Sequence, residues 1–182
     1  MSKHIALVGF MAAGKTTVGR HLARELGFPF IDTDELIVAL EGPIQALFAR
    51  VGEAGFRAAE FEAVRAVLDG PLAVIALGGG AVTHAPTQAL LAARALRVYL
   101  DVPVETLVAR LRRSRTVRPL VGREPTAERV RELLDLREPL YREADLVVRS
   151  RHTSKLAYAR AIAHAIDDRA GCTSHATSKS VP

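Results

Sequence analysis

The segment GFMAAGKTT, residues 9–17, combines glycines, a lysine and threonines in an order that suits phosphate binding. It fits the pattern G-x-x-x-x-G-K-[ST] and lies between an apolar run and a predicted helix. In such a phosphate loop, backbone N–H groups and the helix N-terminus converge on phosphate oxygens. We expect Lys15 to reach the β- and γ-phosphates of a nucleotide and Thr16 to ligate Mg²⁺. A glycine-rich turn with an exposed lysine is the alternative.

The phosphate loop alone leaves the reaction open, because GTPases, small-molecule kinases and ATP-driven motors share it. GTPases also carry a base-recognition motif such as N-K-x-D, which this sequence lacks. ATP-driven motors usually have a longer chain and an acidic residue after a second apolar strand, whereas AVIAL, residues 73–77, is followed by glycines. The kinases remain.

Two carboxylates follow a short apolar segment in FIDTDE, residues 30–35. Ligands of parallel sheets gather at the carboxyl ends of strands, so we expect Asp32 and Asp34 to lie beside the phosphate loop. Their spacing in an extended chain would point both side chains the same way. One carboxylate would hold water on Mg²⁺, and the other would orient a hydroxyl that accepts a phosphoryl group. Alternatively, this pair caps the helix that begins at ELIVAL.

Arg57 lies in GEAGFRAAE, residues 52–60, with Glu60 one helical turn after it and Glu53 one turn before it. As an exposed ion pair, these residues would contribute little to stability. In the functional alternative, Glu60 orients Arg57 toward a cleft, where the guanidinium grips a carboxylate of the substrate. Spacing alone does not decide between the two.

LGGGAV, residues 77–82, places three consecutive glycines directly after an apolar run. Because glycine gives up side-chain contacts, we expect a ligand to approach this backbone closely. Further on, TVRPLVG, residues 116–122, is an irregular segment in an arginine-rich region. A flexible loop with an arginine suits a lid that closes over a nucleotide and excludes water. A solvated basic loop is the alternative, and the lack of interleaved aromatic residues disfavours binding of single-stranded nucleic acid.

Short apolar runs alternate with longer amphipathic segments, which predicts an α/β fold with a parallel sheet. The expected strands cover residues 5–8, 30–31, 72–77, 96–100 and 146–148. The expected helices cover residues 15–26, 88–95, 103–112, 126–137 and 155–168, with two further pieces between residues 44 and 68 separated at Gly52 and Gly55. Thr126 is expected to cap its helix. Residues 170–182 offer little that could pack, so we expect a disordered tail.

The chain of 182 residues has a net charge of +5 and the composition of one globular domain. No segment is long and apolar enough to span a membrane, and the first apolar run is too short for a secretory signal. The only cysteine, Cys172, has no partner for a disulfide. We therefore expect a cytoplasmic protein.

In combination and order, these motifs resemble the shikimate kinase family. The shared strings are the phosphate-loop pattern, D-T-D, G-E-x-x-F-R-x-x-E, L-G-G-G-A-V, R-P-L and R-x-P-L-Y, spread over residues 5–168. The resemblance implies a three-layer P-loop fold, in which a five-stranded parallel sheet has helices on both faces and a mobile lid. It also implies that ATP, with Mg²⁺, phosphorylates the 3-hydroxyl of shikimate.

The resemblance assigns roles to residues at matching positions. Those implied to bind ATP are Ala12, Ala13, Gly14, Lys15, Thr16, Thr17, Arg110 and Arg118. Those implied to bind shikimate are Asp34, Arg57, Gly78, Gly79, Gly80 and Arg137, with the two arginines on its carboxylate. Those implied to hold Mg²⁺ are Thr16 and Asp32. The implied catalytic residues are Lys15, Asp34 and Arg118, with Asp34 as the proton acceptor and Arg118 in the lid.

The implied organisation is a single kinase domain over residues 1–169, followed by the disordered tail. Within this domain, an acceptor-binding helical region covers about residues 33–62 and the lid covers about residues 112–124. The resemblance also suggests a monomer whose partners are ATP and shikimate, and neither nucleic acid nor membrane.

The chain departs from the family pattern in its nucleotide-binding residues. Ala12 stands where the phosphate loop usually has a glycine, which a negative φ angle would accommodate. Leu111 occupies the usual position of an arginine that stacks on adenine. Arg110 or Arg112 must then take this role, and we favour Arg110. A related kinase such as a gluconate kinase, a non-catalytic relative and a nucleic-acid-binding module are the alternatives.

Overall fold

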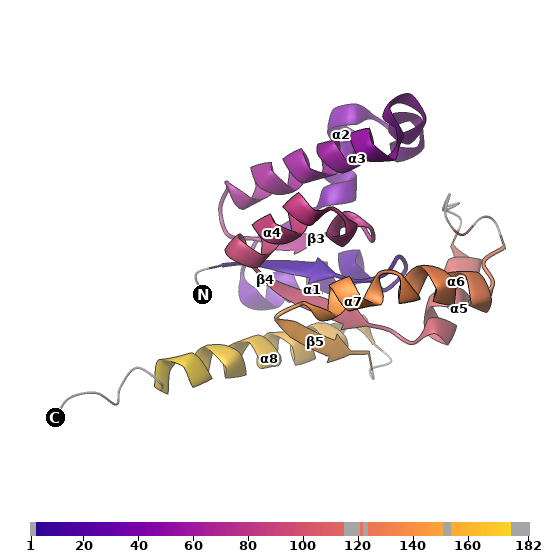
Figure 1. The fold of residues 1–182 in the computed structure, drawn as a ribbon. Helices are drawn as coiled ribbons and strands as arrows, with labels where there is room; N and C mark the ends of the chain where they lie inside the picture. Colours follow the sequence, from indigo (N-terminus) through magenta and orange to yellow (C-terminus); the bar gives the residue numbers. More distant parts are fainter. Residues whose placement is uncertain (1–2, 115–120, 122–123, 151–153, 176–182) are drawn as a thin grey trace.

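A five-stranded parallel sheet in the order β2-β3-β1-β4-β5 forms the centre of the protein (Figure 1). The computed structural model describes residues 3–114, 121, 124–150 and 154–175, with side chains in the last helix described as far as residue 169. The strands are β1 (His4–Val8), β2 (Phe30–Asp32), β3 (Val74–Ala76), β4 (Ala95–Asp101) and β5 (Leu146–Arg149). The predicted α/β fold with a parallel sheet is confirmed.

The strands β1 and β3 are buried along their whole length, because helices cover both faces of the sheet. Every residue of β1 and β3 is buried. In the register of the sheet, Leu7 lies opposite both Ala76 and Val98, and Asp32 at the end of β2 also lies opposite Ala76. The carboxyl ends of β1, β2 and β3 therefore meet at one edge. The segments that leave these strands become neighbours there.

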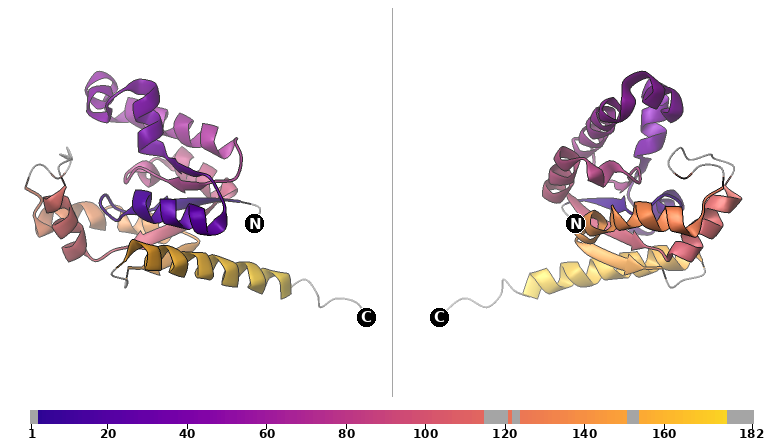
Figure 2. Two further views of the ribbon diagram at one scale, coloured as in Figure 1. Left: turned by 180° about the vertical axis from the view of Figure 1, so that it is seen from behind. Right: turned by 45° about the vertical axis from the view of Figure 1, so that its right-hand side comes forward.

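Helices cover both faces of the sheet and extend beyond its ends (Figure 1). They are α1 (Lys15–Leu26), α2 (Thr33–Glu41), α3 (Ile44–Leu68), α4 (Ala85–Arg94), α5 (Val104–Arg113), α6 (Ala127–Asp135), α7 (Glu138–Arg142) and α8 (Lys155–His175), with a 3₁₀ helix, η1 (Ala81–Thr83). α1 and α8 pack together on one face, in front of the sheet in the left view of Figure 2. α4 and α7 lie on the opposite face, which is in front in Figure 1. None of the described helices could cross a membrane.

α2 and α3 extend together from one end of the sheet and share a small core of their own (Figure 1). Its buried members are Ile37, Leu47, Phe56 and Ala63. α3 bends at Gly52, whose φ of 69° and ψ of −174° lie outside the helical region. The break predicted at both Gly52 and Gly55 therefore occurs at Gly52 alone. With this bend and a core of their own, α2 and α3 form a projecting subdomain beside the edge of the sheet (Figure 1).

Several segments differ from the sequence-based expectation. α7 was not predicted, and α4 starts at Ala85, with a proline in its first turn. α8 continues to His175, so the disorder expected from residue 170 is wrong for residues 170–175, because extending a formed helix is easier than starting one. The rest of the expected tail, residues 176–182, lies outside the described residues. The predicted cap at Thr126 is confirmed, because its hydroxyl accepts the N–H of Arg129 at 3.2 Å.

Candidate active site

The phosphate loop connects β1 to α1 at the carboxyl edge of the sheet. Gly14 caps α1 in the left-handed conformation, with φ 100° and ψ 21°. The side chain of Lys15 is buried, and its Nζ donates hydrogen bonds to the carbonyls of Gly9 at 2.7 Å and Phe10 at 3.0 Å. The amine is thus folded over the loop, where a bound phosphate would compete with these carbonyls for it.

Ala12 has a left-handed backbone with φ 62°, and no other described non-glycine residue has a positive φ. The negative φ expected at this position is therefore wrong. A Cβ atom makes this conformation less favourable by about 1 kcal/mol, so the surrounding loop must hold it. Arg110 contributes to this, because its Nη1 donates to the carbonyls of Ala12 at 3.1 Å and Ala13 at 2.9 Å.

Thr16 and Asp32 form a direct pair at the phosphate loop. Oγ1 of Thr16 donates to Oδ2 of Asp32 at 2.6 Å, and both residues line a cavity of about 150 Å³, the phosphate cavity. The described part of the chain holds no cluster of three or more His, Cys, Asp or Glu side chains that could bind a metal ion. A hydroxyl beside a carboxylate suits Mg²⁺, which takes oxygen ligands and completes its shell with water and substrate phosphates.

Asp32 and Asp34 do not share an extended segment, because α2 begins at Thr33. Oδ1 of Asp32 accepts the N–H of Asp34 at 3.0 Å, so Asp32 caps α2 and the capping alternative holds for this residue. Asp34 lies in the first turn of α2. A Cβ atom placed on Gly78 would be 2.9 Å from its Oδ1. Both carboxylates line the phosphate cavity, as expected, although the segment that carries them is helical from Thr33 and not extended.

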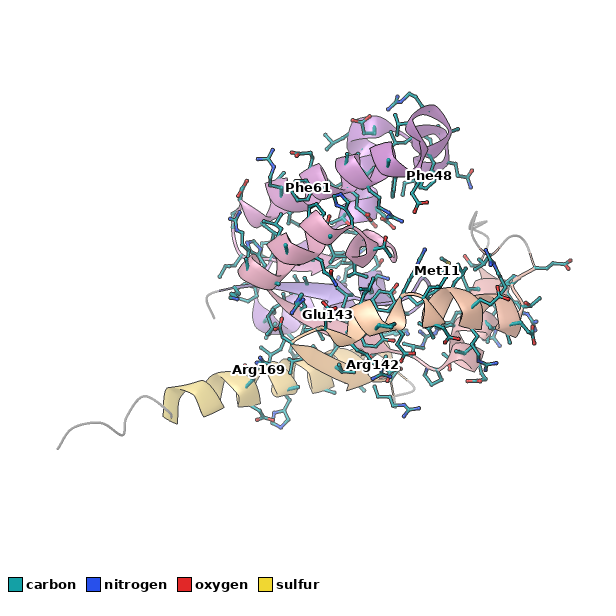
Figure 3. The ribbon with its side chains drawn as sticks, viewed as in Figure 1. Met11, Phe48, Phe61, Arg142, Glu143 and Arg169 are labelled. Carbon is teal, nitrogen blue, oxygen red and sulfur yellow. The ribbon has the colours of Figure 1, made fainter. Side chains whose placement is uncertain are left out.

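A larger cavity of about 330 Å³, the acceptor cavity, lies between the phosphate loop and α3. Met11 lines it from the loop, and Phe48 lines it from α3 (Figure 3). The ring of Phe48 lies 5.0 Å from that of Phe56, which also lines the cavity. The ionisable residues of its wall are Asp34, Glu53, Arg57, Glu60 and Arg137. Such a cavity, partly apolar with several converging charges, suits a small anionic ligand.

Arg57 belongs to the wall of the acceptor cavity, and its side chain is only 12% exposed. Its Nη1 donates to Oε2 of Glu60 at 2.6 Å, and its Nη2 lies 3.5 Å from a carboxylate oxygen of Glu53. Burial raises the pKa of Glu60, while the guanidinium of Arg57 opposes this rise. The structure therefore favours the buried arrangement over the exposed ion pair.

The glycine segment, residues 78–80, leaves no room for side chains. A Cβ atom on Gly78 would lie 2.3 Å from Oε1 of Glu60, and one on Gly80 would lie 2.3 Å from Nη2 of Arg57. One on Gly79 would lie 3.1 Å from the backbone nitrogen of Met11. Side-chain atoms of Glu60 and Arg57 and the backbone of Met11 therefore lie close to the glycine backbone, where we expected a ligand.

Arg137 immediately precedes α7 and is 8% exposed. It lines the acceptor cavity, and its Nη1 donates to the carbonyl of Gly79 at 3.3 Å. Arg57 and Arg137 therefore bring two guanidinium groups to one cavity from distant parts of the sequence. Two such groups can bind a carboxylate through charge-assisted hydrogen bonds.

Arg110 and Arg112 lie on α5 but contact different segments. Arg110 holds the phosphate loop, whereas Nε of Arg112 donates to the carbonyl of Pro125 at 3.1 Å. Lys155 joins Arg110 behind the loop, because its Nζ would lie 2.8 Å from a Cβ atom placed on Gly14. This amine is buried without a hydrogen-bond partner among the described residues. Burial and the charge of Arg110 lower the pKa of Lys155 to about 8.

Thr33 is a part of the site to which the sequence analysis gave no role. Its side chain is fully buried, and its hydroxyl donates to the carbonyl of Ala76 at 3.3 Å and accepts the N–H of Gly78 at 3.2 Å. It thereby ties the start of α2 to the glycine segment. Its position between the two aspartates in D-T-D is the sequence feature that could have indicated a role in the site. Arg118 and most of the expected lid, residues 115–120 and 122–123, lie outside the described residues.

Comparison with known proteins identifies the family. The family model for shikimate kinase matches residues 11–167. A shikimate kinase from Parasynechococcus marenigrum (strain WH8102) is 43% identical over 161 residues, which cover 88% of this chain and 84% of that protein. A solved structure of shikimate kinase from Acinetobacter baumannii in complex with shikimate has a TM-score of 0.86 and 40% identity, covering 92% of this chain and 94% of that one. A gluconokinase from Sinorhizobium meliloti, with a TM-score of 0.56 at 15% identity over 92% of this chain and 97% of that one, shares the fold. Because the family model and these relatives match most of its length, this chain belongs to the shikimate kinase family.

Proposed function

We propose that this protein transfers the γ-phosphoryl group of ATP to the 3-hydroxyl of shikimate, giving shikimate 3-phosphate and ADP. The observation that carries the proposal is the junction of the two cavities. The phosphate loop lines one cavity, the paired arginines line the other, and Asp34 lines both. A phosphoryl donor and a carboxylate-bearing acceptor would therefore meet at Asp34. Membership of the family and the relative whose structure contains shikimate support this acceptor.

Shikimate combines a carboxylate with several hydroxyl groups on a cyclohexene ring, and the acceptor cavity offers a partner for each. Arg57 and Arg137 bind the carboxylate. The glycine segment, Gly78 to Gly80, contacts the ring and its hydroxyls through backbone groups. Phe48 and Phe56 supply apolar surface for the carbon skeleton. This arrangement turns the 3-hydroxyl toward the phosphate cavity.

Phosphoryl transfer depends on alignment and on stabilisation of charge more than on a strong base. Lys15 exchanges its bonds to the loop carbonyls for the β- and γ-phosphates of ATP. Asp34 orients the 3-hydroxyl and accepts its proton as the new oxygen–phosphorus bond forms and ADP leaves. Thr16 and, through water, Asp32 would hold Mg²⁺, which neutralises phosphate charge.

The nucleotide is bound by residues 12–17 of the phosphate loop and by Arg110. The two hydrogen bonds of Arg110 to loop carbonyls use N–H groups in the guanidinium plane. We assign the flat face of this group to stacking on adenine. Arg118 is assigned to the γ-phosphoryl group on the family resemblance alone.

We further propose that residues 1–169 act as one kinase domain, with residues 33–62 as the acceptor-binding region and residues 112–124 as the lid. The protein works as a monomer in the cytoplasm and binds neither nucleic acid nor membrane. These assignments follow from the family resemblance, and the single sheet supports one domain.

A coupled ADP-release assay with ATP and Mg²⁺ tests the activity. We expect ADP release to depend on shikimate and to be absent with gluconate and other hydroxy acids in a matched panel. Mass spectrometry of the product should show one added phosphoryl group on shikimate. Release of ADP at the same rate with and without shikimate, or a preference for gluconate, would refute the proposal.

A further inference from the structure

The hydroxyl group of Tyr141 lies inside the protein, directly against the active site. Tyr141 follows Arg137 by one helical turn in α7, and its side chain is 0% exposed. Its hydroxyl donates a hydrogen bond to the carbonyl of Gly79. The ring of Tyr99 stacks on that of Tyr141, with centroids 5.2 Å apart and planes at 24°. The position of the hydroxyl is therefore fixed by packing from β4.

The carbonyl that Tyr141 holds belongs to the centre of the glycine segment. It also accepts the 3.3 Å hydrogen bond from Arg137, so two donors fix its direction. A peptide unit is planar and trans, and its C=O and N–H groups point in opposite directions. Fixing the carbonyl of Gly79 therefore fixes the N–H of Gly80 as well. No described residue accepts that N–H in a hydrogen bond, and Gly80 lines the acceptor cavity.

Gly79 lies at the boundary between the two halves of the site. It lines both the phosphate cavity and the acceptor cavity. On its other side, a Cβ atom would be 3.1 Å from the nitrogen of Met11 in the phosphate loop. Glycine has an unusually free backbone, so this peptide needs an external restraint to keep one orientation.

We propose that Tyr141 is a positioning residue for the phosphoryl transfer, which holds the Gly79–Gly80 peptide in the orientation that presents the N–H of Gly80 to the acceptor. The proposal rests on the proposed function. It assigns Tyr141 a share in acceptor binding, although its hydroxyl contacts the backbone of Gly79 and the side chain of Arg137 and not the substrate.

The competing explanation is that the hydroxyl of Tyr141 is only a buried polar group that needs a partner. Burial raises the pKa of Tyr141 to about 12, so the hydroxyl stays protonated and can donate under either explanation. The chain offers a matched control for the structural role. Tyr158 is 1% exposed, and its hydroxyl donates to the carbonyl of Val148 in β5, which does not line either cavity.

The test compares Tyr141→Phe with Tyr158→Phe in the ADP-release assay, with thermal unfolding measured for both. Each variant removes a buried hydroxyl that donates to a backbone carbonyl, so both are expected to lose thermal stability. Tyr141→Phe should raise KM for shikimate by roughly tenfold and KM for ATP by less than about twofold, because the Gly79–Gly80 peptide then keeps only the 3.3 Å hydrogen bond from Arg137. Tyr158→Phe should leave KM for shikimate unchanged.

The outcomes separate the two proposals. An unchanged KM for shikimate in Tyr141→Phe, or an equal rise in both variants, overturns the positioning role while the wild-type activity stands. If the wild-type protein shows no shikimate-dependent ADP release, the proposed function fails and the role of Tyr141 falls with it. Should Tyr141→Phe be too unstable to assay, Tyr99→Leu serves instead. This variant removes the ring that stacks on Tyr141 and keeps the hydroxyl of Tyr141. A raised KM for shikimate with an unchanged KM for ATP in that variant supports the role, and an unchanged KM for shikimate overturns it.

Discussion

The carboxylate of Glu60 fixes the guanidinium of Arg57 at 2.6 Å inside the protein, where these side chains are 1% and 12% exposed. The second carboxylate oxygen of Glu60 has no hydrogen-bond partner among the described residues and closely approaches Gly78. A buried pair of this kind is weak evidence for stability, because removing two charges from water costs about as much as their attraction returns. Its position in the wall of the acceptor cavity makes orientation of Arg57 the better explanation.

Replacing Glu60 should therefore affect acceptor binding. In Glu60→Ala the guanidinium of Arg57 loses its main anchor, and we expect KM for shikimate to rise about tenfold with little change in KM for ATP. The matched control is Glu62→Ala, since Glu62 pairs with Arg65 on the exposed side of the same helix. Steady-state kinetics with each substrate varied in turn measures both values. Equal effects of the two variants would contradict the orienting role.

The two arginines of the acceptor cavity are expected to act on the carboxylate of shikimate. Arg57→Ala and Arg137→Ala should each raise KM for shikimate by about tenfold or more, because each removes a charge-assisted hydrogen bond. KM for ATP should change far less. Arg65→Ala, at an exposed position of α3, serves as the control. Similar increases in the KM values of both substrates would argue against binding of the carboxylate by these two arginines.

The role of Asp34 can be distinguished from that of the binding residues, because its replacement should affect kcat. Asp34→Asn keeps the shape of the side chain but removes the proton acceptor, so kcat should fall by about 10²-fold or more while ATP binding stays nearly intact. Glu35→Gln is the control, because the neighbouring Glu35 is exposed and pairs with Arg20. Calorimetry with ATP and steady-state rates give the two quantities. Near-normal turnover in Asp34→Asn would remove Asp34 from the proposed mechanism.

The left-handed backbone of Ala12 predicts an easily made stabilising variant. Ala12→Gly should raise the free energy of unfolding by about 0.5 kcal/mol, because relief of the unfavourable φ exceeds the entropy that glycine adds to the unfolded chain. Ala13→Gly is the opposite case, since Ala13 is buried without a positive φ and should lose stability. Urea unfolding of both variants measures the difference. A loss of stability in Ala12→Gly would show that the left-handed conformation carries no strain.

The buried amine of Lys155 predicts a pH-dependent gain of stability on its removal. Because the pKa falls from 10.5 in the unfolded chain to about 8 in the fold, folding disfavours the charged form. The resulting cost is complete below about pH 8 and disappears as the pH rises toward 10.5. Lys155→Met should therefore be more stable than wild type by about 1 kcal/mol at pH 7, after allowance for partial solvation, and the gain should shrink above pH 8.

Chemical denaturation at several pH values between 7 and 10 measures this gain. Lys3→Met, at an exposed position, should show no comparable stabilisation at pH 7. A constant difference between Lys155→Met and wild type across the range would mean that packing, rather than charge, is responsible.

Features set by a few consecutive residues could be predicted from the sequence. The phosphate loop positions Lys15 and Thr16 through local backbone geometry, and the parallel sheet brings Asp32 to the same edge. The direction of Arg57 could not be predicted, because an exposed and a buried pair with Glu60 have the same spacing. The contact of Arg137 with Gly79 depends on packing between elements far apart in the chain. The positive φ of Ala12 is imposed by the loop against the preference of the residue.

Met11, Asp34 and Gly79 belong to the walls of both cavities, so no barrier of other residues separates the two ligands. A synthetic inhibitor that joins a nucleoside polyphosphate to a shikimate-like ring could therefore occupy both cavities at once. After one half docks, the other is present at an effective concentration in the millimolar range or above, and the two affinities reinforce each other. A substitution at one of these three residues that prevents the inhibitor from binding would also weaken binding of the natural substrates.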